Sequence, residues 1–366
     1  MATLFSIPIK EPFDPSSLKV EVKNTTIDQL YVMLKNDLID LQPDFQRHGD
    51  LWNNQKKSRL IESIILGLPL PSFYFYVDEK RKKWVVIDGL QRLCALNDFM
   101  VKKTLYLEGL QFLGKTHTKR GYDDFSYFEQ LDISMRSVTL NVISGDSSSE
   151  AKYIIFQRIN SGGTSLRPAE IRNALYHGES MEFIKNLAVC NEFKKATNNS
   201  VSEKRMLVLD YVSRFFSFYI QGYEAYDNDN MDGFIGKSLE IMNNNPNCFK
   251  DLQNIFLRAL ATCHELLGKE AFRQPLTEKE KKGNITKLNP ISIALFESTM
   301  YAIAKLTEQE QATLISRKVR FQKNYAALFQ DPQIIKLLSN GTNKFKSVYT
   351  RFTQLEEVVK RTISNN

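Results

Sequence analysis

The sequence predicts an α+β protein, with a small mixed sheet in its N-terminal part and an all-α region after it. Runs of β-branched and aromatic residues predict strands at 73–77, 84–87 and 138–143. Beyond residue 178 such runs nearly vanish, and apolar residues recur with helical periodicity instead. We therefore expect two domains, residues 1–178 and residues 179–366.

Helices with apolar faces accompany the predicted strands. Residues 1–24 are expected to be an extended lead-in, after which Thr25 and Thr26 resemble the cap of a first helix. A second helix is predicted at about 55–66, because its apolar residues form one stripe. A third is predicted over 90–99, directly after a strand. The N-terminal domain should therefore pack helices against its sheet.

The C-terminal region is expected to contain helices alone. Residues 273–289 are rich in Lys, Glu, Pro and Gly, so an exposed linker is predicted there. The expected helices lie near residues 180–195, 202–221, 231–244, 248–267, 289–306, 308–327 and 344–362.

Composition indicates a globular protein and argues against several classes. Hydrophobic residues make up 42% of the chain and charged residues 25%, which allows a sizeable core. No apolar run has the length of a transmembrane helix, and the first residues do not resemble a signal peptide, so we expect a cytoplasmic protein without membrane contact. The cysteines are far apart and the histidines lack metal-ligand spacing, so neither a disulfide framework nor a zinc site is predicted.

The positive charge is unevenly distributed along the chain. The formal net charge is +7, and residues 317–366 carry ten Lys or Arg against three Asp or Glu, which accounts for all of it. A basic segment of this kind predicts contact with nucleic acid phosphates, although solvated basic helices have the same composition. The residues predicted to bind nucleic acid are Arg317, Lys318, Arg320 and Lys323.

The most informative stretch is VVIDGLQRLCAL, residues 85–96, which predicts a strand, a sharp turn and a helix. A helix start offers free N–H groups to an anion, and Gly89 could let the backbone approach a ligand closely. Arg92 could fork onto phosphate oxygens, and Asp88 could hold a metal ion or a water molecule. The alternative is an ordinary strand–turn–helix with a surface arginine.

Two further polar sets stand beside turns. Phe45-Gln46-Arg47 follows a proline, and FQRINSGG, residues 156–163, ends a predicted helix. If these sets converge on the Asp88 turn, they form a cleft rich in guanidinium and amide groups, which suits phosphates. The sequence spacing does not establish this convergence. The expected nucleotide-binding residues are Gln46, Arg47, Gly89, Arg158, Asn160, Gly162 and Gly163.

Several ordered motifs resemble the N-terminal domain of GmrSD-type modification-dependent restriction proteins. IDGLQRLCAL resembles the (I/V)DGQQR signature of that family. The stretches LQPDFQRHGDLWNNQKKSRLIESIILGLPLPSFYFY and IFQRINSGGTSLRPAEIRNALYHG resemble its other boxes, and the similarity continues to about residue 300. The resemblance implies a ParB/sulfiredoxin-like fold, in which a Gly-x-x-Arg turn holds nucleotide phosphates. It also implies nucleoside triphosphate hydrolysis that licenses DNA cleavage.

The resemblance assigns roles to particular residues. Asp88, Gln91 and Arg92 take the catalytic positions, with Asp88 as the Mg²⁺ ligand or the group that positions the attacking water. Arg92 and Arg47 would stabilise phosphate charge, and Asn160 would orient a ligand or water. The chain departs from the family pattern at Leu90, which replaces a glutamine and removes one amide from the expected pocket. It also contains no recognisable His-Asn-His nuclease domain, so DNA cleavage would need a partner protein or the first domain itself.

These observations predict a nucleotide-binding, NTP-hydrolysing component of a phage-defence or DNA-restriction system. The expected cofactor is an NTP with Mg²⁺, and the expected partners are DNA and a separate nuclease or defence-system protein. Two alternatives remain: a ParB-like switch that binds nucleotide or DNA without turnover, and a nuclease that uses the same loop. If Arg92 is a surface residue, its replacement by Ala should abolish nucleotide binding with little effect on stability.

Overall fold

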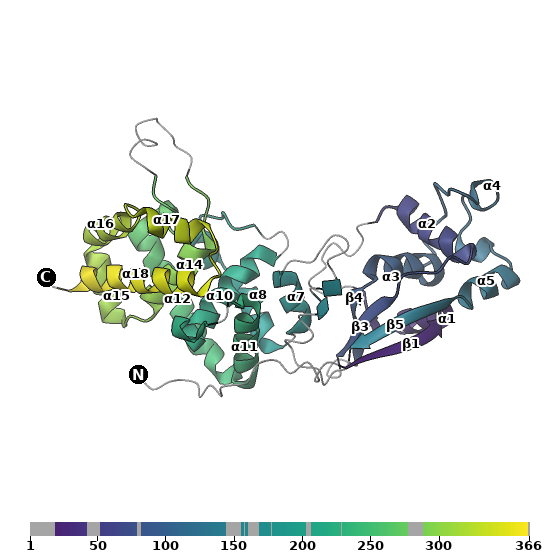
Figure 1. The fold of residues 1–366 in the computed structure, drawn as a ribbon, viewed down its shortest axis with the longest axis horizontal. Coiled ribbons are helices and arrows are strands. Elements are labelled where there is room, and N and C mark those ends of the chain that lie inside the picture. The colour runs from purple at the N-terminus through teal and green to yellow at the C-terminus, as the bar shows by residue number, and fades with distance from the viewer. Residues whose placement is uncertain are drawn as a thin grey trace. The chain divides into compact units, whose positions relative to one another are not determined.

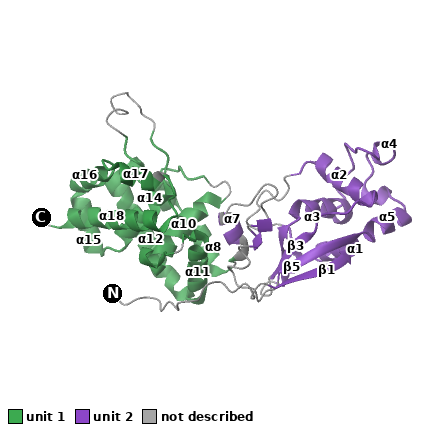
Figure 2. Cartoon of the chain, viewed as in Figure 1, with its two compact units in different colours: residues 1–10, 176–366 green, residues 11–175 purple. Residues whose placement is uncertain are grey.

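The chain divides into two compact units, which are coloured separately in Figure 2. Among the described residues, 19–175 belong to one unit and the residues from 176 onward belong to the other. The computed structural model describes residues 19–41, 52–78, 82–143, 155–156, 158–159, 168–176, 178–202, 206–227, 229–276 and 288–364.

The first unit contains a five-stranded mixed sheet in the order β1-β5-β3-β4-β2. Figure 1 labels β1, β5, β3 and β4. Antiparallel pairing joins β1 to β5 and β3 to β4, whereas β3 and β5 are parallel, as are β2 and β4. The predicted small mixed sheet is therefore confirmed. The strands are β1 (Val20–Thr26), β2 (Ile39–Asp40), β3 (Phe73–Asp78), β4 (Lys83–Asp88) and β5 (Ser137–Ile143).

Helices pack onto this sheet and bury one continuous apolar cluster. The cluster includes Phe73 and Phe75 of β3 and the apolar stripes of the first three helices, as the patterns at 55–66 and 90–99 predict. The helical segments of this unit are α1 (Ile27–Lys35), α2 (Asn54–Ile65), α3 (Leu90–Leu96), the π-helical turn η3 (Asn97–Val101), α4 (Gly114–His117), the 3₁₀ turn η4 (Tyr122–Asp124), α5 (Tyr127–Ser134) and α7 (Pro168–Leu175).

The N-terminal lead-in differs from expectation, because its last residues form strand β1. Its sequence, VEVKNTT, alternates apolar and polar residues only over its first four positions, and its first five residues are exposed on both faces. Backbone pairing with β5, rather than burial, fixes it in the sheet. The strand leads directly into α1, whose N-cap is Thr26 as predicted.

The second unit is helical among its described residues. The helix predicted over 180–195 is divided at 189–190, and the helix predicted over 308–327 is divided at Arg317. Helix α17 was not predicted. The helical segments are α8 (Glu179–Ala188), α9 (Asn191–Ala196), α10 (Leu207–Gln221), η7 (Tyr223–Ala225), α11 (Met231–Asn244), η8 (Pro246–Cys248), α12 (Phe249–Leu267), η9 (Gly268–Glu270), α14 (Ile293–Ala304), α15 (Glu308–Ser316), α16 (Lys318–Leu328), α17 (Pro332–Ser339) and α18 (Phe345–Ile363).

The segment predicted as an exposed linker begins with a buried residue. Arg273 is only 6% exposed, and its guanidinium donates to the Lys269 carbonyl at 3.2 Å and to the carbonyl of Asn289. A β-bridge also joins Arg273 to Ile291. The two ends of the segment are therefore clamped together, and residues 277–287 lie outside the described part of the chain.

Candidate functional site

The turn after β4 has the predicted strand–turn–helix form. Gly89 has a φ of 102°, a conformation that side chains disfavour, and α3 begins at the next residue. A Cβ atom on Gly89 would lie 2.5 Å from Cδ1 of Phe73. The fold itself therefore requires glycine here, because the Phe73 ring occupies the space that a Cβ atom would take. The close approach of a ligand to the Gly89 backbone stays a prediction.

Arg92 is buried, so the prediction of a surface arginine is wrong. The residue is 8% exposed, and its guanidinium lies 4.5 Å from the centre of the Phe73 ring. It donates to the Pro71 carbonyl, to the Ser72 carbonyl at 3.2 Å, and to the Asp88 carboxylate at 2.9 Å. Burial lowers the pKa of Arg92, while the charge of Asp88 acts in the opposite direction. The geometry makes Arg92 a clamp between the start of β3 and the end of β4.

Asp88 keeps an exposed acceptor at the end of β4. Its side chain is 44% exposed, and only Oδ2 accepts from Arg92. The other carboxylate oxygen has no hydrogen-bond partner in the described part of the chain. A carboxylate that is held in place on one side and open on the other can bind a cation or accept a proton.

The two residues between Gly89 and Arg92 point to different surroundings. Leu90 is 4% exposed and packs into the core, so this position faces the protein interior, contrary to its expected place in a pocket wall. The side-chain oxygen of Gln91 accepts the backbone N–H of Trp52 at 3.1 Å. Gln91 therefore ties the turn to the residue that follows the segment carrying Gln46 and Arg47.

The convergence of the three polar sets stays a prediction. Gln46, Arg47, Asn160, Gly162 and Gly163 lie outside the described residues. Arg158 is described, and its side chain is exposed. The described residues also contain no group of three or more His, Cys, Asp and Glu that could hold a metal ion.

The basic residues near the C-terminus do not form one uniform surface. Arg317 donates to the carbonyls of Thr362, Ile363 and Ser364, at 2.5–3.2 Å, and thereby caps the end of α18. Lys318 and Lys323 are exposed on α16, whereas Arg320 is half-buried. Arg351 is 1% exposed and bonds to a buried glutamate. Lys318 and Lys323 are thus the predicted contacts that are best placed for a phosphate.

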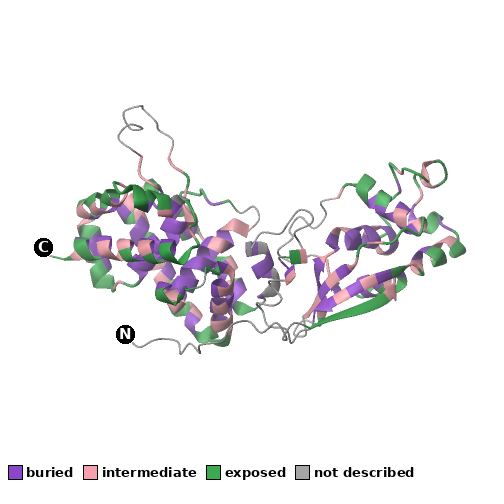
Figure 3. Cartoon of the chain, in the orientation of Figure 1, coloured by how far each residue is buried: buried purple, intermediate pink, exposed green. Residues whose placement is uncertain are grey.

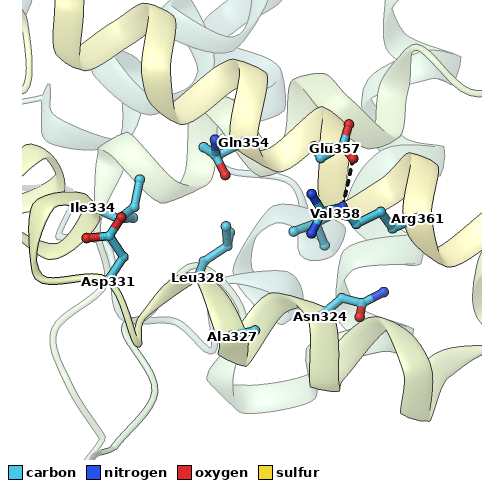
Figure 4. Close-up of a pocket in the computed structure, with 9 residues that line it drawn as sticks. All are labelled: Asn324, Ala327, Leu328, Asp331, Ile334, Gln354, Glu357, Val358 and Arg361. Carbon is cyan, nitrogen blue, oxygen red and sulfur yellow. Dashed lines mark hydrogen bonds and ion pairs between the residues drawn. The ribbon is translucent and has the colours of Figure 1, made fainter.

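The second unit contains hollows that are lined by described residues. One, of about 200 Å³, lies between α16, α17 and α18 and is shown in Figure 4. Its rim carries the ion pair between Arg361 Nε and Glu357 Oε1, at 2.7 Å, while Leu328 and Val358 are among its apolar lining residues. The other, of about 460 Å³, includes Asp210 in its lining. No function is predicted from the sequence for either hollow.

Helix α2 carries a buried carboxylate that was not predicted from the sequence. Glu62 is 3% exposed and accepts the backbone N–H groups of Gln111, Phe112 and Leu113 at 2.7–3.0 Å. Burial alone would raise its pKa, but the three amides outweigh burial and lower it. The only sequence signal was a charged residue inside the apolar stripe of α2.

A second missed cluster lies inside the helical unit. Glu297 of α14 is fully buried and accepts from Arg351 of α18 and from Arg214 of α10, the latter at 3.1 Å. Arg214 also donates to the Asn343 side chain at 2.8 Å. The shared carboxylate joins three helices in the core, which indicates a structural role.

These features define an α+β domain with a carboxylate–arginine pair on a strand–turn–helix, followed by a helical unit. Residues 30–177 match the family model described as GmrSD restriction endonuclease, N-terminal domain. The match confirms the resemblance over this part of the chain, whereas the similarity that was expected as far as about residue 300 lies outside the match. Residues 178–366 lie outside the match. Neither the search of curated proteins nor the search of solved structures found a match. None of the described helices is both long enough and apolar enough to cross a membrane.

Proposed function

We propose that this chain is a component of a restriction or phage-defence system, and that residues 30–177 bind and hydrolyse a nucleoside triphosphate. The family description, which names a restriction endonuclease, supports the first part. The observation that carries the second part is the Asp88 carboxylate, which is 44% exposed and held in place by Arg92. Such a carboxylate on a rigid turn suits the chemistry of a metal-bound polyphosphate.

Asp88 is the proposed Mg²⁺ ligand or the acceptor that orients the attacking water. Protein sites usually hold Mg²⁺ through one or two carboxylates together with substrate phosphates, so a single open carboxylate fits. A bound Mg²⁺ would neutralise part of the negative charge of the phosphates. Arg92 becomes a positioning residue in this proposal, because its donors fix Asp88 and two carbonyls.

The remaining phosphate contacts are assigned to arginines outside the turn. Arg47 precedes Trp52 by five residues in the sequence, and the Trp52 backbone N–H is bonded to Gln91 of the turn. We therefore assign the first proposed phosphate contact to Arg47. Arg158 has an exposed side chain and is the second proposed cation, with Asn160 orienting ligand or water.

The test is phosphate release from the purified full chain with four NTPs and Mg²⁺, with and without DNA. Asp88→Asn should reduce release by about 10²-fold or more, because the metal ligand or water acceptor is lost. Asp132→Asn is the matched control, because Asp132 also pairs with an arginine four residues later, at 2.7 Å, and is 64% exposed. The control should keep the parent rate.

Two other results would replace the proposal. Nucleotide binding without phosphate release from the parent protein would indicate the non-hydrolysing switch. DNA cleavage by the isolated chain that is lost in Asp88→Asn, in the absence of NTP turnover, would indicate a nuclease at the same turn.

A further inference from the structure

Strand β1 forms an outer edge of the sheet with an extended exposed backbone. Within the described residues it pairs with β5 alone, over seven residues in an unbroken register. The strand contains no proline and no bulge, which are common devices that protect such edges. Figure 3 shows it as exposed along most of its length, and Val22 is 63% exposed. An edge of this kind is a template for a further strand.

The ladder with β5 determines which backbone groups face outward. Ile27 N–H donates to the Arg136 carbonyl at 3.0 Å, and this pair continues the β1–β5 register by one step. Hydrogen-bonding pairs alternate along an antiparallel ladder, so Thr25, Lys23 and Glu21 direct their backbone groups toward β5. The backbone groups of the residues between them point to the open edge; these residues are Val20, Val22 and Asn24.

We propose that β1 pairs antiparallel with β1 of a second copy of this chain, across a two-fold axis at Val22. In this register Val22 faces Val22 of the other copy, and both present outward N–H and C=O groups, as the ladder requires. Glu21 of each copy then faces Lys23 of the other copy. The two-fold axis thus creates two identical ion pairs, each with one residue from each copy. Two five-stranded sheets become one continuous sheet.

The side-chain charges select this register over its neighbours. Because outward backbone groups must meet outward groups, the next possible registers bring Glu21 opposite Glu21 or Lys23 opposite Lys23. Like charges directly opposite each other are destabilising. Within one chain, Lys23 Nζ lies 3.1 Å from Glu21 Oε2, and the side chains of Glu21 and Lys23 are 67% and 44% exposed. An exposed pair of this kind contributes little, so exchanging it for pairs between copies costs little.

The test is the oligomeric state of the full chain, measured by sedimentation velocity from about 1 μM to 1 mM. The parent protein should show a concentration-dependent dimer. Glu21→Lys and Lys23→Glu should each weaken association at least about tenfold, because each places like charges opposite each other. Far-UV circular dichroism should be unchanged, because both side chains are exposed.

Mixing the two variants separates this register from a general charge effect. A chain with Glu21→Lys and a chain with Lys23→Glu are complementary to each other, so their equimolar mixture should dimerise although neither does alone. The double variant Glu21→Lys/Lys23→Glu should also regain the dimer. A parent that stays monomeric throughout, as it would if another segment covered the edge, would overturn the proposal. So would single variants that dimerise like the parent, or a mixture that does not associate.

Discussion

Arg92 holds the Asp88 carboxylate, and two backbone carbonyls hold Arg92. These carbonyls belong to Pro71 and Ser72, which lie 21 and 20 residues earlier in the chain. The motif identified the arginine and the aspartate from the sequence, but the acceptors outside the motif were not visible in it. The sequence could therefore locate the turn and could not distinguish an arginine that binds a ligand from one that positions Asp88.

Replacing Arg92 tests this distinction through stability. Arg92→Ala should lower the free energy of unfolding by about 2–4 kcal/mol, because buried acceptors lose their donor and Phe73 loses its cationic neighbour. Urea denaturation measures the change. Lys103→Ala is the control, since Lys103 is 46% exposed and its ion pair with Asp123 should contribute less than about 1 kcal/mol. A parent-like midpoint for Arg92→Ala would return Arg92 to the phosphate-binding role.

Glu62 gives a prediction about pH. Its pKa in the folded protein lies below the ordinary value of 4.5, so its stabilising contribution is present above that pH and is lost as the pH falls through the folded pKa. Glu62→Gln should therefore be less stable at pH 7 by about 1–3 kcal/mol and should lose less stability between about pH 5 and pH 3. Chemical denaturation at several pH values measures both effects.

The exposed neighbour Glu108 supplies a control for this effect. Glu108→Gln removes a carboxylate from an exposed position and should change the free energy of unfolding at pH 7 by less than about 0.5 kcal/mol. If Glu62→Gln loses as much stability as the parent when the pH falls, the three amides do not stabilise the charged form of Glu62.

Among the elements, those with a periodic apolar pattern were predicted from the sequence, and those held by polar or backbone interactions were not. The stripes on α2 and α3 are buried as expected, because burial and periodicity express the same physical constraint. Strand β1 was missed because its pairing depends on backbone groups rather than on apolar side chains. The division between α15 and α16 at Arg317 was also missed, and the Arg317 guanidinium bonds to the distant end of α18.

Helix α16 carries the revised prediction for nucleic acid binding. Since Arg317 caps α18, we assign phosphate contacts first to Lys318 and Lys323, which are exposed. Lys318→Gln/Lys323→Gln should flatten the log–log dependence of DNA or RNA affinity on salt by about 1.8, or roughly 0.9 per contact. The measurement is a fluorescence-anisotropy titration at several salt concentrations.

A charge-matched control keeps this test specific to α16. Lys102→Gln/Lys103→Gln removes the same charge from exposed positions of the other unit and should leave the slope unchanged. Equal effects of the two double variants would indicate a general charge effect, and no salt-sensitive binding by the parent would leave α16 as ordinary solvated surface.

At the scale of the whole molecule, the loss of strand signals near residue 178 predicts a boundary between a mixed domain and a helical one. The sequence could not reveal the core of the helical unit, because Glu297 lies 83 residues from Arg214 and 54 from Arg351. Contacts over such distances depend on tertiary packing, which leaves no local pattern. The family match ends at residue 177, so the nucleotide proposal rests on the first unit alone.

The most direct test of the central claim is hydrogen–deuterium exchange of the full chain with and without Mg²⁺ and each of the four NTPs. If nucleotide binds at the Asp88 turn, at least one NTP should slow exchange in peptides that cover residues 85–93 and 42–52. The same nucleotide should leave α15 to α17 unchanged, and Asp88→Asn should remove the protection. Protection confined to residues after 177, or no protection of the turn by any NTP, would contradict the account.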